Sequence, residues 1–114
     1  MIRRIRDRET FRRLTRHGVR LRRSVLWCRW CPDPEQTATT VAFAINRACG
    51  PAVVRNRTRR RLREALRAID RIDPLPPGAL LIGTKPAATE LTFEQLSSEL
   101  AAMVRQLRTA EPKA

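Results

Sequence analysis

The sequence is poor in the residues from which enzymes build acid–base sites. It holds a single histidine, His17, at the end of an expected helix among arginines, where a surface or capping role fits its surroundings. The carboxylates are scattered, and no pair has the spacing of a two-metal site. The segment from Cys49 to Arg57 also lacks the glycine spacing of a phosphate-binding loop. We therefore expect a protein that binds its partners and does not catalyse a reaction alone.

Cysteine is too scarce for a structural metal centre. Cys28 and Cys31 form a C-x-x-C motif and Cys49 stands apart, so that only His17 could complete a four-ligand zinc site. A thioredoxin-like redox pair opens a helix, whereas this motif lies in a strand-like segment just before Pro32. We expect ordinary strand cysteines that stay reduced.

Long apolar runs are missing as well. No stretch of eighteen or more apolar residues occurs, which excludes a membrane-spanning helix. The basic N-terminus, MIRRIRDRETFRRL, has no apolar core of a secretory signal, and Asp7 and Glu9 argue against a transit peptide. These absences predict a cytoplasmic protein without a membrane partner.

Positive charge is what the chain has in excess. Its 114 residues suit one domain with one core, and 24 basic against 11 acidic residues give a net charge of +13 and a pI of about 11.7. Such a balance points to nucleic acid first and to an anionic membrane surface second. Because no helix-turn-helix or zinc-finger pattern is visible, RNA fits better than DNA.

The excess is concentrated in residues 55–67, RNRTRRRLREALR, more than half of which are arginine. At the helical step of about 100° per residue, an apolar side separates from a cationic side. The apolar side comprises Val54, Thr58, Leu62, Ala65, Leu66 and Ile69. Arginines four apart on the cationic side repel one another, and an external polyanion would relieve that repulsion.

The remaining segments predict an α-β-β-β-α-β-α order, which is a small α+β sandwich with a four-stranded sheet. We expect strands over 19–31 (split near 23–24), 39–46 and 79–84, helices from Asp7 to about 17, over 51–71 and from Thr92 onward, and a basic lead-in over 1–6. Residues 1–108 would form the domain and 109–114 a loose tail. Alternation in the second strand puts Trp27 and Arg29 on one face, which we expect to be the wetter one.

Two helix ends carry clear signals. Gly18 is expected to terminate the first helix in the manner of a left-handed cap. Thr92 and Gln95 fit a capping box at the start of the last helix. Its expected apolar stripe is Phe93, Leu96, Leu100, Met103 and Leu107.

Three segments of the chain resemble a known protein family. The segment 41–67, VAFAINRACGPAVVRNRTRRRLREALR, is similar to the signature of the bacterial ribonuclease P protein subunit, in which a strand leads into a G-x-A-V-x-R-N-R-x-[KR]-R-x-x-R-[EQ] helix. ETFRRLTRHG at 9–18 and KPAATELTFEQL at 85–96 resemble the family's first helix and its last helix start. The resemblance therefore covers about the whole chain.

The resemblance implies a specific function, which the composition alone does not predict. It implies the protein subunit of an RNA-based endoribonuclease that removes the 5′ leader from precursor tRNA. The catalytic RNA subunit and its Mg²⁺ ions would perform the hydrolysis, with one protein per RNA and no cofactor on the protein alone. It also implies a left-handed β-α-β crossover, against the general right-handed rule.

The resemblance also implies site residues. The RNR motif, expected to contact catalytic RNA and help position metal, is Arg55, Asn56, Arg57, Arg59, Arg60 and Arg63. The expected leader-binding cleft is Phe11, Trp27 and Arg29, and the further basic contacts are Arg12, Arg16, Arg47 and Arg67. Thr15 stands where a second aromatic is common in the family, and Arg29 where tyrosine is frequent, so stacking could shift to Trp27 or to arginine planes.

Two alternatives stay open on the residues alone. A non-catalytic RNA-binding protein, such as a ribosomal protein, would also be small and very basic. A cationic binder of membrane surfaces or of the nucleoid would share the charge.

Overall fold

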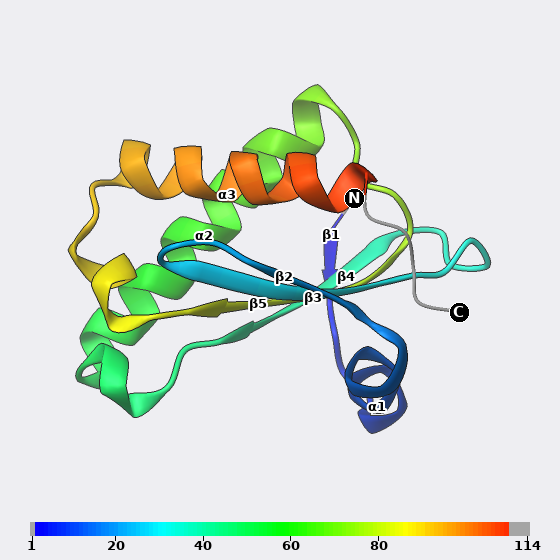
Figure 1. Ribbon diagram of the computed structural model, residues 1–114, viewed down its shortest axis with the longest axis horizontal. Coiled ribbons are helices and arrows are strands. Elements are labelled where there is room, and N and C mark those ends of the chain that lie inside the picture. Colours follow the sequence, from blue (N-terminus) through cyan, green and yellow to red (C-terminus); the bar gives the residue numbers. More distant parts are fainter. Residues whose placement is uncertain (1, 110–114) are drawn as a thin grey trace.

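The computed structural model describes residues 2–109, in which three α-helices enclose a five-stranded sheet (Figure 1). The elements in chain order are β1 (Ile2–Arg4), α1 (Arg8–His17), β2 (Val19–Arg22), β3 (Leu26–Pro32), β4 (Thr39–Ala44), the 3-10 turn η1 (Arg47–Cys49), α2 (Ala52–Ile72), β5 (Gly78–Thr84), the 3-10 segment η2 (Pro86–Glu90) and α3 (Phe93–Thr109). The α+β class is as predicted.

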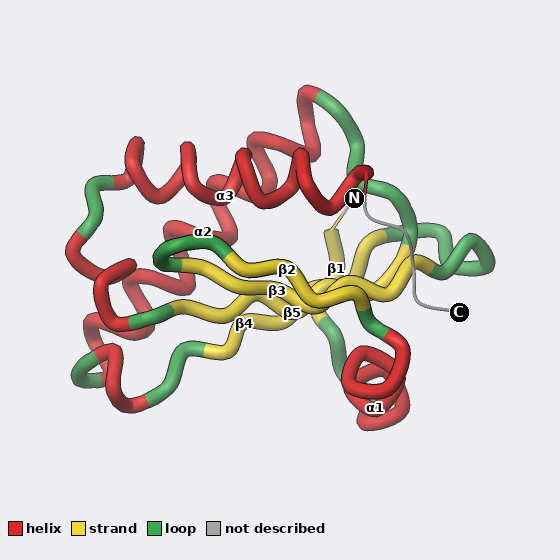
Figure 2. The backbone as a smooth tube through the Cα atoms, viewed as in Figure 1, coloured by secondary structure: helices red, strands yellow, loops and turns green. Residues whose placement is uncertain are grey.

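The strands lie in the order β1-β4-β5-β3-β2. β1, β4 and β5 run parallel, and β3 and β2 run antiparallel to their neighbours. Helices α2 and α3 cover one face of the sheet, and α1 lies on the other (Figures 1 and 2). We call these the α2 face and the α1 face. The link from β4 through α2 to β5 is the expected β-α-β unit.

The prediction of four strands was wrong by one. Residues 2–4, expected as a basic lead-in, pair in parallel with 39–41 of β4. A three-residue strand is too short to show a period of two, and its partner lies far along the chain. The split of 19–31 into two strands is confirmed.

Alternation along β3 sorts its side chains between the two faces. Leu26, Cys28 and Trp30 are buried on the α2 face, at the centre of the main core. Trp27 and Arg29 lie on the α1 face and are half-buried, so the predicted wetter face is confirmed. The core therefore sits between the sheet and the pair α2 and α3.

Helix α2 buries the centre of the apolar side that its sequence predicts, whereas Val54 and Ile69 at the two ends of that side are half-buried. Thr58, Leu62, Ala65 and Leu66 are buried, with Leu62 fully inaccessible. The Thr58 hydroxyl is satisfied within the helix, because it donates to the carbonyl of Val54 at 3.0 Å. Packing on this side fixes the opposite, cationic side toward solvent.

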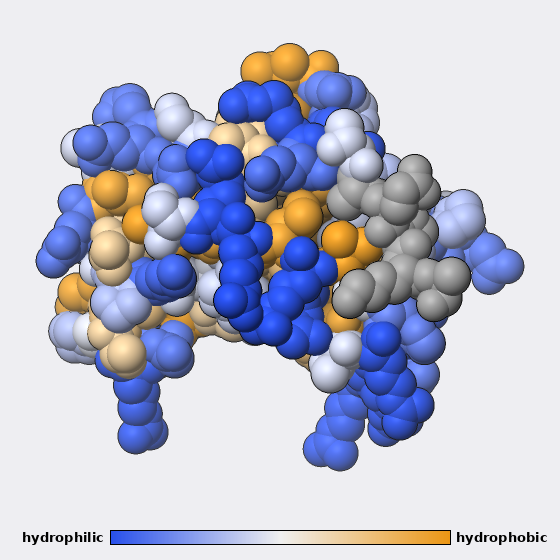
Figure 3. Space-filling model, viewed as in Figure 1, coloured by the Kyte–Doolittle hydropathy of each residue, from blue (hydrophilic) through white to orange (hydrophobic). Residues whose placement is uncertain are grey.

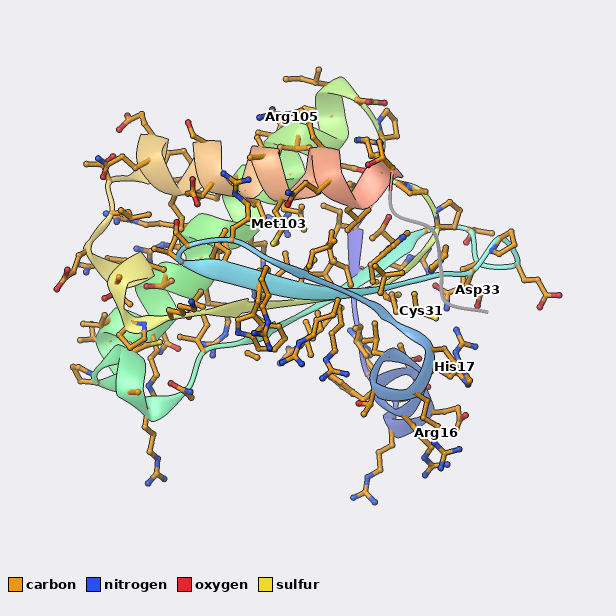
Figure 4. All side chains as sticks on the ribbon, viewed as in Figure 1. Arg16, His17, Cys31, Asp33, Met103 and Arg105 are labelled. Atoms are coloured by element: carbon orange, nitrogen blue, oxygen red, sulfur yellow. The ribbon has the colours of Figure 1, made fainter. Side chains whose placement is uncertain are left out.

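Helix α3 begins with the predicted capping box. The Thr92 amide donates to the Gln95 side chain at 2.9 Å, and the Gln95 amide donates to the Thr92 hydroxyl at 3.1 Å. The expected stripe is buried except for Phe93, the first residue of the helix, which is 37% exposed. Met103 points from α3 into the core (Figure 4). The expected tail is helical at Thr109 and otherwise lies outside the described residues.

Helix α1 begins and ends at the predicted residues. The Asp7 carboxylate accepts from the amide and the hydroxyl of Thr10, and these bonds lower the pKa of Asp7 below its usual value. Gly18 does not adopt the expected left-handed conformation, since its φ is −69°. Glycine suits this position for another reason: a Cβ there would collide with the Leu14 carbonyl oxygen, to which the Gly18 amide donates.

The packing of α2 predicts the cost of a core truncation. Leu62→Ala should lower the free energy of unfolding by about 2–5 kcal/mol, because it leaves a cavity beneath the arginine face. Chemical denaturation followed by circular dichroism measures this loss. Arg71→Ala, at an exposed position of the same helix, should change stability by no more than about 0.5 kcal/mol. Equal losses in the two variants would contradict the assigned packing.

Candidate RNA-binding surfaces

The α1 face of the sheet is organised in rows that cross the strands. Strand pairing aligns Arg22, Trp27, Gly83 and Ala44 in one row. The next row aligns Arg20, Arg29, Leu81 and Ala42. Helix α1 packs farther along, where Leu14 forms a small second core with Ile5 and Ala79. Figure 3 shows the lower margin of the molecule hollowed between α1 and the turn that joins β4 to α2.

Trp27 lies flat across the neighbouring strand. A Cβ built on Gly83 would overlap the indole ring of Trp27, so the ring occupies the space that any side chain at this position would take. Arg22 is the cross-strand partner of Trp27 on the other side and is exposed. The row therefore presents a half-buried aromatic ring beside a free guanidinium.

Arg29 connects this surface to helix α1. Its Nη1 donates to the Thr15 carbonyl oxygen at 3.3 Å, near the helix C-terminus, where a positive charge is favourable. Phe11 lies one turn before Thr15 on α1 and is 40% exposed. The three residues expected at the leader cleft thus belong to one side of the sheet: Phe11 on the helix, and Trp27 and Arg29 on β3.

The RNR residues start on the first turns of α2 and differ in how they are held. Arg55 is half-buried, and its Nε donates to the Gly50 carbonyl at 3.1 Å, which ties it to the turn before the helix. Asn56 accepts from Arg59 Nη1 at 2.7 Å and so orients that guanidinium. Arg63 lies over the Phe43 ring, with 5.8 Å from its Cζ to the ring centroid.

The other predicted basic residues are solvent-facing. Exposed side chains belong to Arg57, Arg60, Arg67, Arg47, Arg12 and Arg16. Arg12 forms an exposed ion pair with Glu9 at 3.1 Å, which offsets part of its charge. His17 is exposed next to Arg16 at the end of α1 (Figure 4), in agreement with its predicted surface role.

A groove of about 600 Å³ joins the two sets of residues. Phe11 lines it from α1, and Arg59, Arg63 and Arg67 line it from α2. From the sequence, these four residues were assigned to different sites: Phe11 to the leader cleft, Arg59 and Arg63 to the RNR motif, and Arg67 to the further basic contacts. Trp27 and Arg29 do not line this groove, and they lie farther across the sheet on β3.

Sequence reasoning missed four arginines that the fold brings to these surfaces. Arg20 and Arg22 project from β2 beside Arg29 and Trp27, and the alternation in VRLR is the signal that would have found them. Arg3 and Arg4 of β1 line the groove, but no pattern in the sequence marks a strand of three residues.

Metal and thiol chemistry have little support among residues 2–109. No three His, Cys, Asp or Glu side chains gather there in a way that could hold a metal ion. Cys28 and Cys31 lie three apart in a strand and therefore on opposite faces, and both are free, as is Cys49. Burial raises the pKa of the Cys28 thiol to about 12, so it is neither a nucleophile nor a ready metal ligand at neutral pH. In the same range, no helix combines the length and the apolar character needed to cross a membrane.

Comparison with known proteins identifies relatives of this chain. The family model for ribonuclease P matches residues 2–108. The ribonuclease P protein component of Streptomyces avermitilis is 34% identical over 113 residues, which cover 91% of this chain and 90% of that protein. The corresponding protein of Thermobifida fusca is 36% identical over 110 residues, covering 90% of this chain and 74% of the relative.

Solved structures share the fold. The ribonuclease P protein of Staphylococcus aureus, in a mutant with defective mRNA degradation activity, superposes with a TM-score of 0.83 at 19% identity and covers 92% of this chain and 87% of that one. The ribonuclease P protein of Thermotoga maritima gives a TM-score of 0.79 at 18% identity, with 90% and 96% covered. The solved structures show the same fold, and the family model and the sequence relatives show that the chain belongs to the ribonuclease P protein family.

Proposed function

We propose that this chain works as the protein subunit of a ribonuclease P ribonucleoprotein in tRNA processing, and that it binds two RNAs at once. The outward side of α2 contacts the catalytic RNA, and the α1 face of the sheet receives the single-stranded 5′ leader of precursor tRNA. Family membership supports the activity, and the arrangement of the two surfaces supports the division of labour.

One observation carries the proposal: α2 buries the centre of its apolar stripe against the sheet while its opposite side presents a row of arginines. Leu62 and Leu66 hold the helix on the sheet, so the arginines cannot turn inward. Guanidinium groups bind phosphates as forked donors and stack on bases, which a structured RNA can satisfy at several positions together. The Asn56–Arg59 hydrogen bond pre-orients one of these donors.

The proposed binding of the leader is supported by the aromatic rings and guanidinium groups on the α1 face. Single-stranded RNA is recognised by stacking of unpaired bases on aromatic rings and on arginine planes. Phe11 and Trp27 supply rings, and Arg22 and Arg29 supply planes nearby. Arg29, in the position where the family often has tyrosine, is partly committed to α1, which leaves Trp27 as the main ring of the sheet.

In this proposal the hydrolysis belongs to the RNA and its Mg²⁺ ions. Mg²⁺ prefers oxygen ligands in octahedral arrangement, whereas the outward side of α2 offers mostly guanidinium donors, which repel a cation. The Asn56 side-chain oxygen is already engaged by Arg59. These residues therefore do not fit a resident Mg²⁺ on the protein alone. One protein per RNA and a cytoplasmic location complete the proposal, the latter supported by three free cysteines.

Family membership disfavours the alternative of a non-catalytic RNA-binding protein such as a ribosomal protein. No separate feature of residues 2–109 supports that alternative over the ribonuclease P subunit.

Cleavage assays with the catalytic RNA test the proposed activity. The protein should accelerate cleavage of precursor tRNA by that RNA at low Mg²⁺, where RNA alone is slow, because its cations offset phosphate repulsion. The rate is measured with and without protein across a Mg²⁺ series, with the protein alone as the control for contaminating nuclease. No acceleration at any Mg²⁺ concentration would contradict the proposal.

Removal of the Phe11 ring tests leader recognition. Phe11→Ala should weaken binding of precursor tRNA by about 1–3 kcal/mol, the usual worth of one base–aromatic stack, and should leave mature tRNA binding nearly unchanged. Affinities of the assembled ribonucleoprotein for both RNAs give the comparison. If both affinities fall equally, Phe11 acts only in packing.

The placement of Trp27 can be tested through its neighbour. Gly83→Ala should displace the indole and weaken leader binding, since the added Cβ takes the space of the ring. In a Trp27→Ala background the same change should cost little, giving a coupling energy of about 0.5–3 kcal/mol in unfolding experiments. Additive losses would show that the ring does not lie on Gly83.

A further inference from the structure

The groove of about 600 Å³ exists because β1 is shorter than the strand it pairs with. β1 covers β4 only along 39–41, and the last contact is the Ile5 amide donating to the Val41 carbonyl at 3.0 Å. The chain then turns away toward Asp7 and α1. The Ala42–Phe43 end of β4 is left as an uncovered edge, with α1 on one side and α2 on the other.

This groove is lined by positive charge without a counter-charge. Its described lining contains Arg3, Arg4, Arg59, Arg63 and Arg67 and no carboxylate. The ion pairs found between described residues involve other arginines, on α1, before β3 and on α3. Five guanidinium groups around one hollow repel one another, and an anion with several charges relieves that repulsion.

β1 supplies positive charge to both sides of the groove, the side formed by α1 and the side formed by α2. Arg3 is aligned with Thr40 and so lies on the α1 face, the side of Phe11. Arg4 is aligned with Val41 and lies on the α2 face, the side of Arg63 and Arg67. Both arginines are exposed. The strand thus places one cation on each side of the uncovered edge.

The lining also favours RNA over a purely anionic peptide. Phe11 offers an exposed ring from α1, and Arg63 of α2 lies over the Phe43 ring, so a ring and a guanidinium face the groove from its two sides. Unpaired bases stack on such surfaces while their phosphates bind the arginines. A duplex has no free base to offer, and the volume suits about one or two nucleotides.

We propose that this groove binds a single RNA strand that crosses the β4 edge between the α1 face and α2, with Arg3 and Arg4 as phosphate contacts. The inference rests on the proposed function and deepens it, because it adds β1 to the RNA-binding surface and joins the two surfaces into one path. The strand is either the precursor-tRNA leader or an unpaired segment of the catalytic RNA, since both carry the same chemistry.

Salt dependence of binding tests the proposal. The double variant Arg3→Gln/Arg4→Gln should make the plot of log K against log salt shallower by about 1.4, which corresponds to two lost contacts with single-stranded phosphates. The matched control is Arg71→Gln/Arg105→Gln, which removes the same charge from exposed positions outside the groove. Arg3→Lys/Arg4→Lys keeps the charge and should retain the wild-type slope, even if glutamine at these positions loosens β1.

Two arms identify the strand. One measures binding of the protein to the catalytic RNA alone, and the other measures binding of the assembled ribonucleoprotein to precursor tRNAs with leaders of about two and about ten nucleotides. A slope change confined to the long leader assigns the groove to the leader, and a change with catalytic RNA alone assigns it to that RNA. Slopes equal to those of the Arg71/Arg105 control in both arms would overturn the inference. Failure of the wild-type protein to stimulate cleavage would instead overturn the proposed function, because the slopes are measured without catalysis.

Discussion

The burial of one side of α2 is the constraint on which the rest of the structure depends. Full burial of Leu62 and Leu66 contributes roughly 1.5–3 kcal/mol each, which outweighs the few tenths of a kcal/mol lost to each like-charge pair along the helix. The helix therefore forms despite its arginines, and the same packing decides which way they point. A free peptide of this sequence would have no such anchor, so the sheet makes the cationic surface usable.

The opposite face of the sheet is governed by small residues. Ala42, Ala44, Ala79 and Gly83 leave room above the backbone, and the fold fills that room at two places. Leu14 of α1 closes one place, and the Trp27 ring closes the other. Because no bulky aliphatic row competes for this space, an aromatic ring can lie flat and keep one side available to a base.

Most of the fold was predictable because its elements are marked locally. The alternation around Trp27, the helical period around Leu62 and the capping box at Thr92 each need only a few adjacent residues, and all three are confirmed. β1 was not predictable, since three residues carry no period and its register is set by β4. The leader-cleft residues and the RNR motif were predicted from the family resemblance. That Phe11 lines one groove with Arg59 and Arg63 depends on where β1 ends, which only the folded chain shows.

The two edges of the sheet have a property in common. β1 and β2 are the outer strands, and each carries two exposed arginines, Arg3 and Arg4 on one and Arg20 and Arg22 on the other. Open strand edges normally invite pairing with another copy, and like charges on both edges oppose it. Between free molecules this repulsion favours solubility at low ionic strength. At an ionic strength of about 0.1 M, salt largely screens the repulsion between charges more than about 10 Å apart. The charges that attract a polyanion thus also keep the protein from polymerising through its sheet before that polyanion arrives.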